Sequence, residues 1–302
     1  MKTVFPLILF AMTVGCAHQL ADRPAEYEFA SQPTRQIIST PIELAQKNYT
    51  NGMVSEAFTG LLNSYDNTHE LQCLEFAAEL ADREIQWMRE QIKEKSELLA
   101  DTQNDLEHFD RWNNSSKLFV GDKAYAFLRG DGIETFSKEH FIPRSDQIKN
   151  NMIKVQIIVS SEIANPNNTE YNRLLTLAKK IKTQRESVCE LRLRYISKIF
   201  IGPRVALGDK LVWLAQNDHP SWGWIPNPDW IEKLELLFPK DYGVWIAQSD
   251  ERTRLDFKSL VSNIKNAIGA KQYEDFQATL DLLSNNKESG IDNWWPAESA
   301  KQ

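Results

Sequence analysis

The chain contains only three cysteines and five histidines among its 302 residues. So few cysteines exclude a small disulfide-rich fold. No stretch after the first twelve residues approaches the ~18–20 apolar residues that a membrane-spanning helix needs. None of the histidines forms a close ligand pair such as H-E-x-x-H, and phosphate-binding loops and nucleophile elbows are missing. We therefore expect no metal site, no cofactor and no enzymatic activity.

Positive charge is also scarce. The 35 Lys and Arg residues are outnumbered by 42 Asp and Glu, which leaves a formal charge of −7. Binding to nucleic acid requires a clustered excess of Lys and Arg. The composition thus excludes nucleic acid as an expected partner, while 42% hydrophobic and 25% charged residues are ordinary values for a globular protein.

The N-terminus has the pattern of a secretory signal. A basic start at Lys2 precedes the apolar residues 4–12, a run too short for a permanent membrane helix. The run ends in Thr-Val-Gly-Cys at 13–16, which resembles a bacterial lipobox. In that family a lipid is attached to the Cys sulfur and cleavage falls just before it. The resemblance implies a signal peptide over 1–15 and lipidation of Cys16, although the family usually has Leu where this chain has Thr13.

The residue after the lipobox bears on location. In lipoproteins, Asp at this position tends to retain the protein in the inner membrane, whereas this chain has Ala17. The resemblance implies an anchor in the outer membrane and a body in the periplasm. Residues 16–40 would form a tether, since Pro24 and Pro33 interrupt a polar stretch with no helical period. Ordinary signal cleavage after Ala17 is the alternative, because Gly-Cys-Ala also fits a cleavage site.

Residues 41–113 are expected to be helical. The spacing of apolar residues over 42–65 predicts two short helices around a turn at 50–52, and it resembles a single tetratricopeptide hairpin. The residues that carry this resemblance are Leu44, Ala45, Gly52, Ala57 and Leu61. A solenoid of such hairpins is not expected, because 34 residues further on Ala78 stands where the pattern requires Leu.

A long helix is predicted next, with Asn67 as its N-cap and Glu70 as the capping partner. Twelve positions keep an unbroken 3-4 spacing, and ten of them are apolar: Leu71, Leu74, Ala78, Ala81, Ile85, Met88, Ile92, Lys95, Leu99, Thr102, Leu106 and Phe109. This heptad seam predicts a coiled-coil helix about 58 Å long. The seam should pair either with another helix of the chain or with a second copy, as a homo-oligomer.

Residues 114–200 are predicted to form a small mixed α/β unit. Runs rich in β-branched and aromatic residues at 117–121, 124–128, 153–160 and 189–200 indicate strands, with helices over 137–151 and 167–187. The pattern resembles the OmpA-like peptidoglycan-binding domain, in which a strand ends in Thr-Asp and Tyr-Asn-x-x-Leu-Ser-x-x-Arg opens a helix. The resemblance implies that Glu162, Tyr171, Asn172 and Lys179 bind peptidoglycan, with Glu and Lys replacing the family's Asp and Arg.

Residues 201–302 contain seven of the nine tryptophans. Three prolines and a glycine within 220–230 predict an irregular loop. Its residues Trp222, Trp224 and Trp230 would form an aromatic platform for sugar rings or a partner, or else a buried strap over a helical layer. Beyond it, apolar spacing predicts a second helical hairpin over 254–268 and 272–283.

The two cysteines other than Cys16 allow two interpretations. Cys73 and Cys189 form an even pair in a compartment that permits disulfides, and a bridge would close a long loop. Alternatively, each is a buried thiol.

The sequence therefore predicts a mainly α fold of helical hairpins and a long heptad helix, with a small α/β unit. The leading functional interpretation is a lipid-anchored, non-enzymatic scaffold or assembly subunit with protein partners in the cell envelope. The alternatives are a peptidoglycan-binding module that ties the outer membrane to the wall, and a glycan-acting enzyme that uses the Trp-rich loop.

Overall fold

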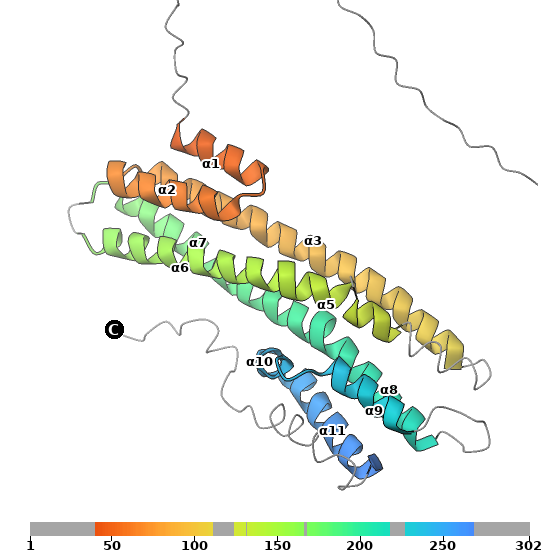
Figure 1. Ribbon diagram of the computed structural model, residues 1–302. Helices are drawn as coiled ribbons and strands as arrows, with labels where there is room; N and C mark the ends of the chain where they lie inside the picture. Colours follow the sequence, from red (N-terminus) through yellow and green to blue (C-terminus); the bar gives the residue numbers. More distant parts are fainter. Residues whose placement is uncertain (1–39, 111–123, 131, 166–167, 218–226, 269–302) are drawn as a thin grey trace, which may run out of the picture. The chain divides into compact units, whose positions relative to one another are not determined.

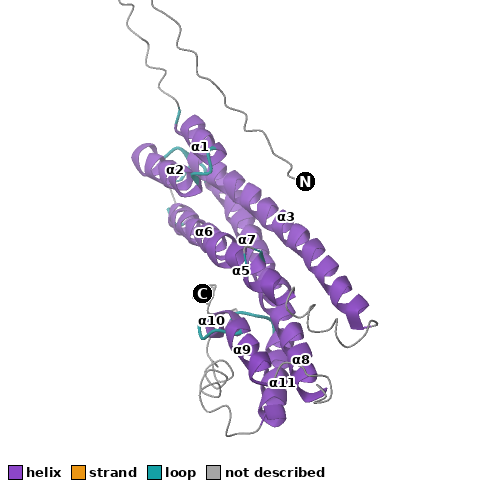
Figure 2. Cartoon of the chain, turned by 45° about the vertical axis from the view of Figure 1, so that its right-hand side comes forward, coloured by secondary structure: helices purple, strands orange, loops and turns teal. Residues whose placement is uncertain are grey.

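A computed structural model describes residues 40–110, 124–130, 132–165, 168–217 and 227–268 (Figure 1). This part of the chain is 89% helical and has no strands, so the predicted mainly α fold is confirmed (Figure 2). None of its helices is both long enough and apolar enough to cross a bilayer. Cys16, nearly all of the tether, the run at 117–121, Trp222, Trp224 and the segment 272–283 lie outside the described residues.

The N-terminal hairpin forms where the sequence predicts it. Helix α1 (Pro41–Thr50) begins with a capping box, in which the Glu43 amide donates to Thr40 Oγ1 at 3.2 Å and the Thr40 amide donates to Glu43 Oε2 at 2.9 Å. Gly52 makes the turn with a φ of +80°, a conformation that costs glycine little. Helix α2 (Val54–Thr68) then packs back on α1.

The corner after α2 differs from the prediction. His69 takes a left-handed conformation with a φ of 54° and ends α2, and α3 (Leu71–Asp110) begins almost at once. Asn67 is therefore not the N-cap of the long helix. It lies in the last turn of α2, where its side-chain amide donates to the Asn63 carbonyl at 2.8 Å. The sequence pattern marked a real boundary but misplaced it, because Asn serves helix ends of both kinds.

The heptad seam of α3 is covered by the chain itself. Its apolar residues from Leu71 to Leu99 are all buried, with exposures of 6% or less. Lys95, the polar member of this stretch, lies with its ammonium group 4.5 Å from the ring centroid of Phe136. Helices α2, α6 and α7 pack against α3 (Figure 1). Of the two predicted pairings, the structure shows the intramolecular one over this stretch.

Two further long helices complete the bundle, and each contains a π-helical segment. The first runs through α5 (Ile133–Phe136), the π segment η1 (Ser137–Phe141) and α6 (Ile142–Ile163). The second runs through α7 (Tyr171–Tyr195), η2 (Ile196–Ile201) and α8 (Gly202–Asn217). The short connection between α6 and α7 makes them an antiparallel pair, and both contact α3.

The predicted α/β unit is wrong within the described residues. Residues 124–128 are helical, 153–160 lie inside α6, and 189–200 lie in α7 and η2. A strand would place Val155, Ile157 and Val159 on one face. Instead Val155 and Val159 are buried while Ile157 is 64% exposed, which is the helical period. Short apolar runs rich in β-branched residues do not distinguish a strand from a buried helix.

Three shorter helices pack against η2 and α8: α9 (Asn227–Leu237), α10 (Tyr242–Ala247) and α11 (Glu251–Ile268). The helix predicted over 254–268 is confirmed. The irregular loop predicted through residue 230 is wrong for its last four residues, which form the start of α9. Pro228 is the second residue of that helix, where no intrahelical partner for its missing N–H is required.

A substitution at Gly202 tests whether the backbone conformation of η2 determines the local fold. A Cβ at this position would collide with the Ser197 carbonyl oxygen, which accepts the π-type hydrogen bond from the Gly202 amide. Gly202→Ala should lower the free energy of unfolding by about 1–3 kcal/mol, measured by urea denaturation. Gly60→Ala is the control, because a Cβ there meets nothing within 4 Å, and it should raise stability by about 0.5–1 kcal/mol. Equal effects of the two substitutions would contradict the argument.

Candidate functional site

The π segment η1 lies against the end of α7, directly before η2. Ser137 of η1 and Tyr195, the last residue before η2, place their hydroxyl oxygens 2.7 Å apart. The rings of Phe141 and Tyr195 stack with centroids 3.6 Å apart. Single-turn π segments are rare and frequently mark functional positions. The surroundings of η1 and η2 are therefore the candidate site.

The π segment η2 decides which way α8 faces. In an uninterrupted α-helix, Tyr195 and Arg204 would lie on opposite faces, because nine residues make about two and a half turns. The i→i+5 bonds of η2 place an additional residue in the turn and rotate Arg204 back toward the Tyr195 side. Both side chains then meet the same neighbouring helix, Tyr195 at Ser137 and Arg204 at Glu134.

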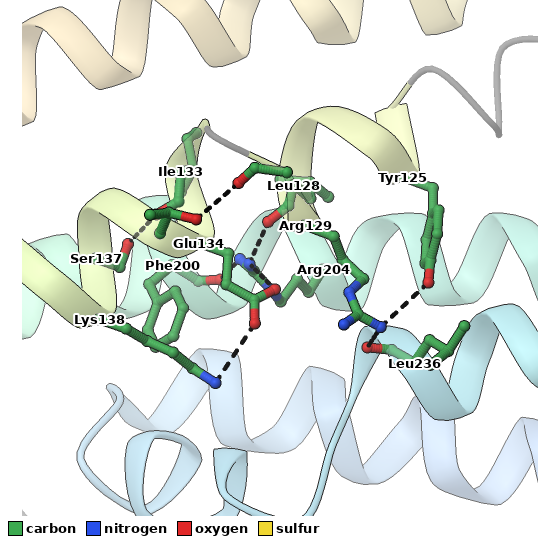
Figure 3. A network of polar contacts seen from close by, with 12 residues as sticks. Tyr125, Leu128, Arg129, Ile133, Glu134, Ser137, Lys138, Phe200, Arg204 and Leu236 are labelled. Atoms are coloured by element: carbon green, nitrogen blue, oxygen red, sulfur yellow. Dashed lines mark hydrogen bonds and ion pairs between the residues drawn. The ribbon is translucent and has the colours of Figure 1, made fainter.

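Arg204 and Glu134 form the centre of a buried polar cluster (Figure 3). The Arg204 side chain is fully buried, and its Nη2 donates to Glu134 Oε2 at 3.2 Å and to the Leu128 carbonyl at 2.5 Å. Its Nη1 donates to the Phe200 carbonyl at 2.5 Å. A buried guanidinium is stable only when paired and hydrogen-bonded, so this contact fixes α8 against residues 124–136.

Lys138 extends the cluster to the C-terminal helices. Its ammonium lies 3.4 Å from Glu134 Oε1, 2.5 Å from Asp241 Oδ2 and 4.8 Å from the ring centroid of Tyr242. Burial raises the pKa of the Tyr242 phenol well above its usual value; Arg204 opposes this shift and Glu134 adds to it. The connection between α9 and α10 is thereby held to η1.

A second cluster surrounds Arg192 of α7, which is 2% exposed. It donates to Ser145 Oγ of α6 and to Gln248 Oε1 after α10, the latter at 3.0 Å, and it lies 3.1 Å from Asp146 Oδ1. Burial lowers the pKa of Arg192 to about 10, an effect that the Asp146 carboxylate opposes. This residue links α7, α6 and the segment before α11.

A third cluster joins α3 to α6. Glu84 is fully buried and accepts two hydrogen bonds of 2.7 Å from Arg144, a bidentate pairing. The Arg144 guanidinium lies 4.0 Å from the ring centroid of Trp87, and Trp87 stacks on Phe141 at 5.6 Å. Burial and Glu84 raise the pKa of the adjacent Tyr49 to about 12. Aromatic stacking thus connects this cluster to the π segments.

The three clusters have one chemistry in common. Each pairs a buried charge on one helix with an opposite charge on another helical segment, and breaking such a pair would leave a charge unpaired in the interior. Among the residues that the structure describes, no group of three His, Cys, Asp or Glu could hold a metal ion. The arrangement is suited to holding helices in register.

The residues predicted to bind peptidoglycan occupy helical positions. Glu162 lies near the end of α6, where its Oε2 accepts from Asn168 at 2.8 Å, and together with burial it raises the pKa of Tyr65. Tyr171 and Asn172 are exposed at the start of α7, and Lys179 is exposed two turns later. The strand that the OmpA-like arrangement requires before Glu162 is helical, so the structural basis of that resemblance is absent from this region.

The remaining predicted residues are placed as follows. Cys73 is buried on α3 and Cys189 is partly buried on α7, and the structure has both as thiols. Trp230 belongs to the start of α9, so it does not share an irregular loop with Trp222. The side chain of Trp230 lies outside the described residues, as do Trp222, Trp224 and Cys16.

Sequence reasoning missed the residues at the centre of all three clusters. A signal was present, since Arg192 falls on the apolar stripe that contains Val188 and Tyr195. Arg204 similarly falls between the buried residues Phe200 and Gly208. A charge on an apolar stripe indicates a buried ion pair, but its partner is distant in sequence.

Comparisons with known proteins do not identify a relative. Neither the protein-family models, the curated proteins nor the solved structures give a match to this chain. Its role is therefore inferred from its own residues and contacts.

The first prediction for the site concerns Arg204. Arg204→Met should reduce the free energy of unfolding by about 3–5 kcal/mol, because it leaves Glu134 and two backbone carbonyls without their buried donor. Arg252→Met is the matched control. Arg252 is 85% exposed and pairs with Asp256 on its own helix, so its loss should change stability by less than about 0.5 kcal/mol. Similar small losses in both variants would show that Arg204 does not fix the fold.

The second prediction concerns alkaline pH. Burial raises the pKa of Tyr195 and Tyr242 above the unfolded value of 10.0. The stability these phenols contribute is complete below pH 10 and is lost as pH rises toward the raised values, by about 1.4 kcal/mol per pH unit for each tyrosine. Arg192 acts oppositely, because its lowered pKa makes the folded chain release a proton first.

Urea denaturation between pH 8 and 11 measures the sum of these opposing effects on the free energy of unfolding. We expect the two tyrosines to outweigh Arg192, so that stability falls with pH. The double variant with Tyr195→Phe and Tyr242→Phe should show a flatter decline above pH 10 than the unchanged chain. An unaltered slope would disprove the assignment to these two phenols.

Proposed function

We propose that this chain is a lipid-anchored, non-enzymatic scaffold or assembly subunit of the bacterial envelope, held on the outer membrane through Cys16. The proposal combines the lipobox at 13–16 with the helical body that begins at Thr40. The intervening proline-interrupted residues would act as a tether between the two.

The observation that supports the scaffold role is a set of buried charged residues that pair between helices. Glu84, Arg192 and Arg204 are each nearly or fully buried, and each pairs with a residue of a helix other than its own. Removal of one partner from such a pair typically costs several kcal/mol, so the helices have one strongly preferred arrangement. A body held in one arrangement suits a protein that presents fixed surfaces to partners.

The packing of α3 limits how such a scaffold associates. Its seam from Leu71 to Leu99 is buried inside the chain, where α2, α6 and α7 pack against α3. A second copy could use that stretch only by displacing these helices. Partners, including other envelope proteins, are therefore expected to bind outer faces of the body.

The anchor is tested by changing Cys16→Ser. In a Gram-negative host fed labelled palmitate, this change should abolish labelling and move the chain from the membrane to the soluble fraction. Cys73→Ser is the matched control, because Cys73 is buried on α3 and should not affect either readout. Retained label in the Cys16 variant, or a mature N-terminus at His18, would reject the anchor.

The scaffold role is tested separately by lysine cross-linking in whole cells. Discrete adducts with envelope proteins are expected from the anchored chain, and loss of the fixed arrangement in Arg204→Met should remove them while palmitate labelling persists. A chain that remains free of adducts and monomeric would contradict the proposal.

A further inference from the structure

An outer face of the α6–α7 pair carries exposed apolar residues. Ile157 of α6 is 64% exposed, the highest value among the large hydrophobic residues that the structure describes, and Tyr171 of α7 is 45% exposed. Ile153 and Leu175 are partly buried and lie one helical turn from these two residues, on the same faces. Apolar side chains in this arrangement indicate a surface that is covered by a partner.

These residues point away from α3. The α3 side of the pair is identified by ion pairs of Arg144 with Glu84 and of Lys180 with Asp82. The hydrogen bond between Gln156 and Arg185 shows which parts of the antiparallel helices α6 and α7 lie near one another. The helical period then places Ile153, Ile157, Tyr171 and Leu175 on the side opposite α3, with Tyr171 and Leu175 nearer the α6–α7 connection than the two isoleucines.

Exposed lysines lie on the same face. Helices α6 and α7 together contain ten Lys and Arg against four Asp and Glu, within a chain whose net charge is −7. Acidic residues of α3 pair with several of these cations on the inner side, among them Arg144 and Lys180. Lys154, Lys179 and Lys182 instead are exposed around Ile157 and Leu175, and Glu186, one turn after Lys182, is also exposed on this side of α7. Basic residues that flank apolar ones are typical of a protein face that binds an anionic membrane.

This face begins at the end of the bundle where the tether enters. Burial and Glu162 at the end of α6 raise the pKa of Tyr65, which places α2 beside the α6–α7 connection. Helix α1 packs on α2 and follows directly after Thr40. In the sequence, residues 17–39 separate Thr40 from Cys16, so the proposed anchor is close in the chain to the end of the bundle at which this face begins.

We propose that the face formed by Ile153, Ile157, Tyr171 and Leu175, with Lys154, Lys179 and Lys182 around it, binds an anionic lipid surface. This inference rests on the proposed anchor, since the tether supplies the high local concentration that makes a weak contact effective. Apolar side chains enter the headgroup region, and each lysine beside anionic lipid strengthens partitioning about fivefold. The contact would orient the body on the membrane that bears its anchor.

The test uses the unlipidated mature chain with Cys16→Ser, so that binding reports on the face alone. The probe is sedimentation with vesicles of phosphatidylcholine, either pure or with about 30% phosphatidylglycerol. We expect binding to the anionic vesicles only, weakened by about 0.5 M salt. Changing Lys154, Lys179 and Lys182 to Gln should lower the partition coefficient on the order of 100-fold.

Matched controls separate the face from general charge and general hydrophobicity. The exposed lysines Lys93, Lys240 and Lys258, changed together to Gln, alter net charge equally and should reduce binding far less. Ile157→Ser should weaken binding, whereas Leu255→Ser should not, although Leu255 is also 54% exposed. Circular dichroism of each variant verifies that it is folded.

Several results would overturn the proposal. They are the absence of sedimentation with anionic vesicles, equal binding to neutral vesicles, and equal losses in the two lysine variants. Vesicle binding that depends on Ile157 but not on the three lysines would reject recognition of anionic lipid. Palmitate labelling of Cys16 is read independently, so failure of the anchor and failure of the face are distinguishable.

Discussion

The cost of burying a guanidinium is the constraint on which the helical arrangement depends. Arg204 is fully buried and can remain charged there only because Glu134 and two backbone carbonyls accept its hydrogen bonds. Phe200 lies on the same continuous helix as Arg204, whereas Leu128 and Glu134 lie on residues 124–136, so a shift of α8 against those residues would leave an unpaired charge in the core. The ion pair therefore selects one register from the many that an apolar interface would tolerate.

The π segments make that pairing possible. Without η2, an α-helical path from Tyr195 to Arg204 would point the two side chains in opposite directions. With η2, Tyr195 reaches Ser137 and Arg204 reaches Glu134, one turn apart on the facing helix. Gly202 permits this geometry because it has no Cβ to collide with the Ser197 carbonyl. The π segment η2 therefore accounts for the position in which Arg204 pairs with Glu134.

Local patterns predicted the helices well and the middle region poorly. The hairpin over 42–65, the long helix from residue 71 and the helix over 254–268 all follow from apolar spacing, which is a local property. The run at 153–160 was assigned to a strand because it is rich in β-branched residues. Burial of Val155 and Val159 with exposure of Ile157 shows a helix, in which tertiary packing outweighs β propensity.

By itself, the sequence determined the mainly α class, the hairpin before the long helix and the presence of a seam on α3, because each depends on periodicity within a few turns. Only the tertiary structure decided that this seam is buried by α6 and α7, and that Glu134 pairs with Arg204, 70 residues away. It also decided that the lysines of α6 and α7 divide between an inner side facing α3 and an outer face. Such contacts depend on which helices meet and at what rotation, and no local pattern encodes that rotation.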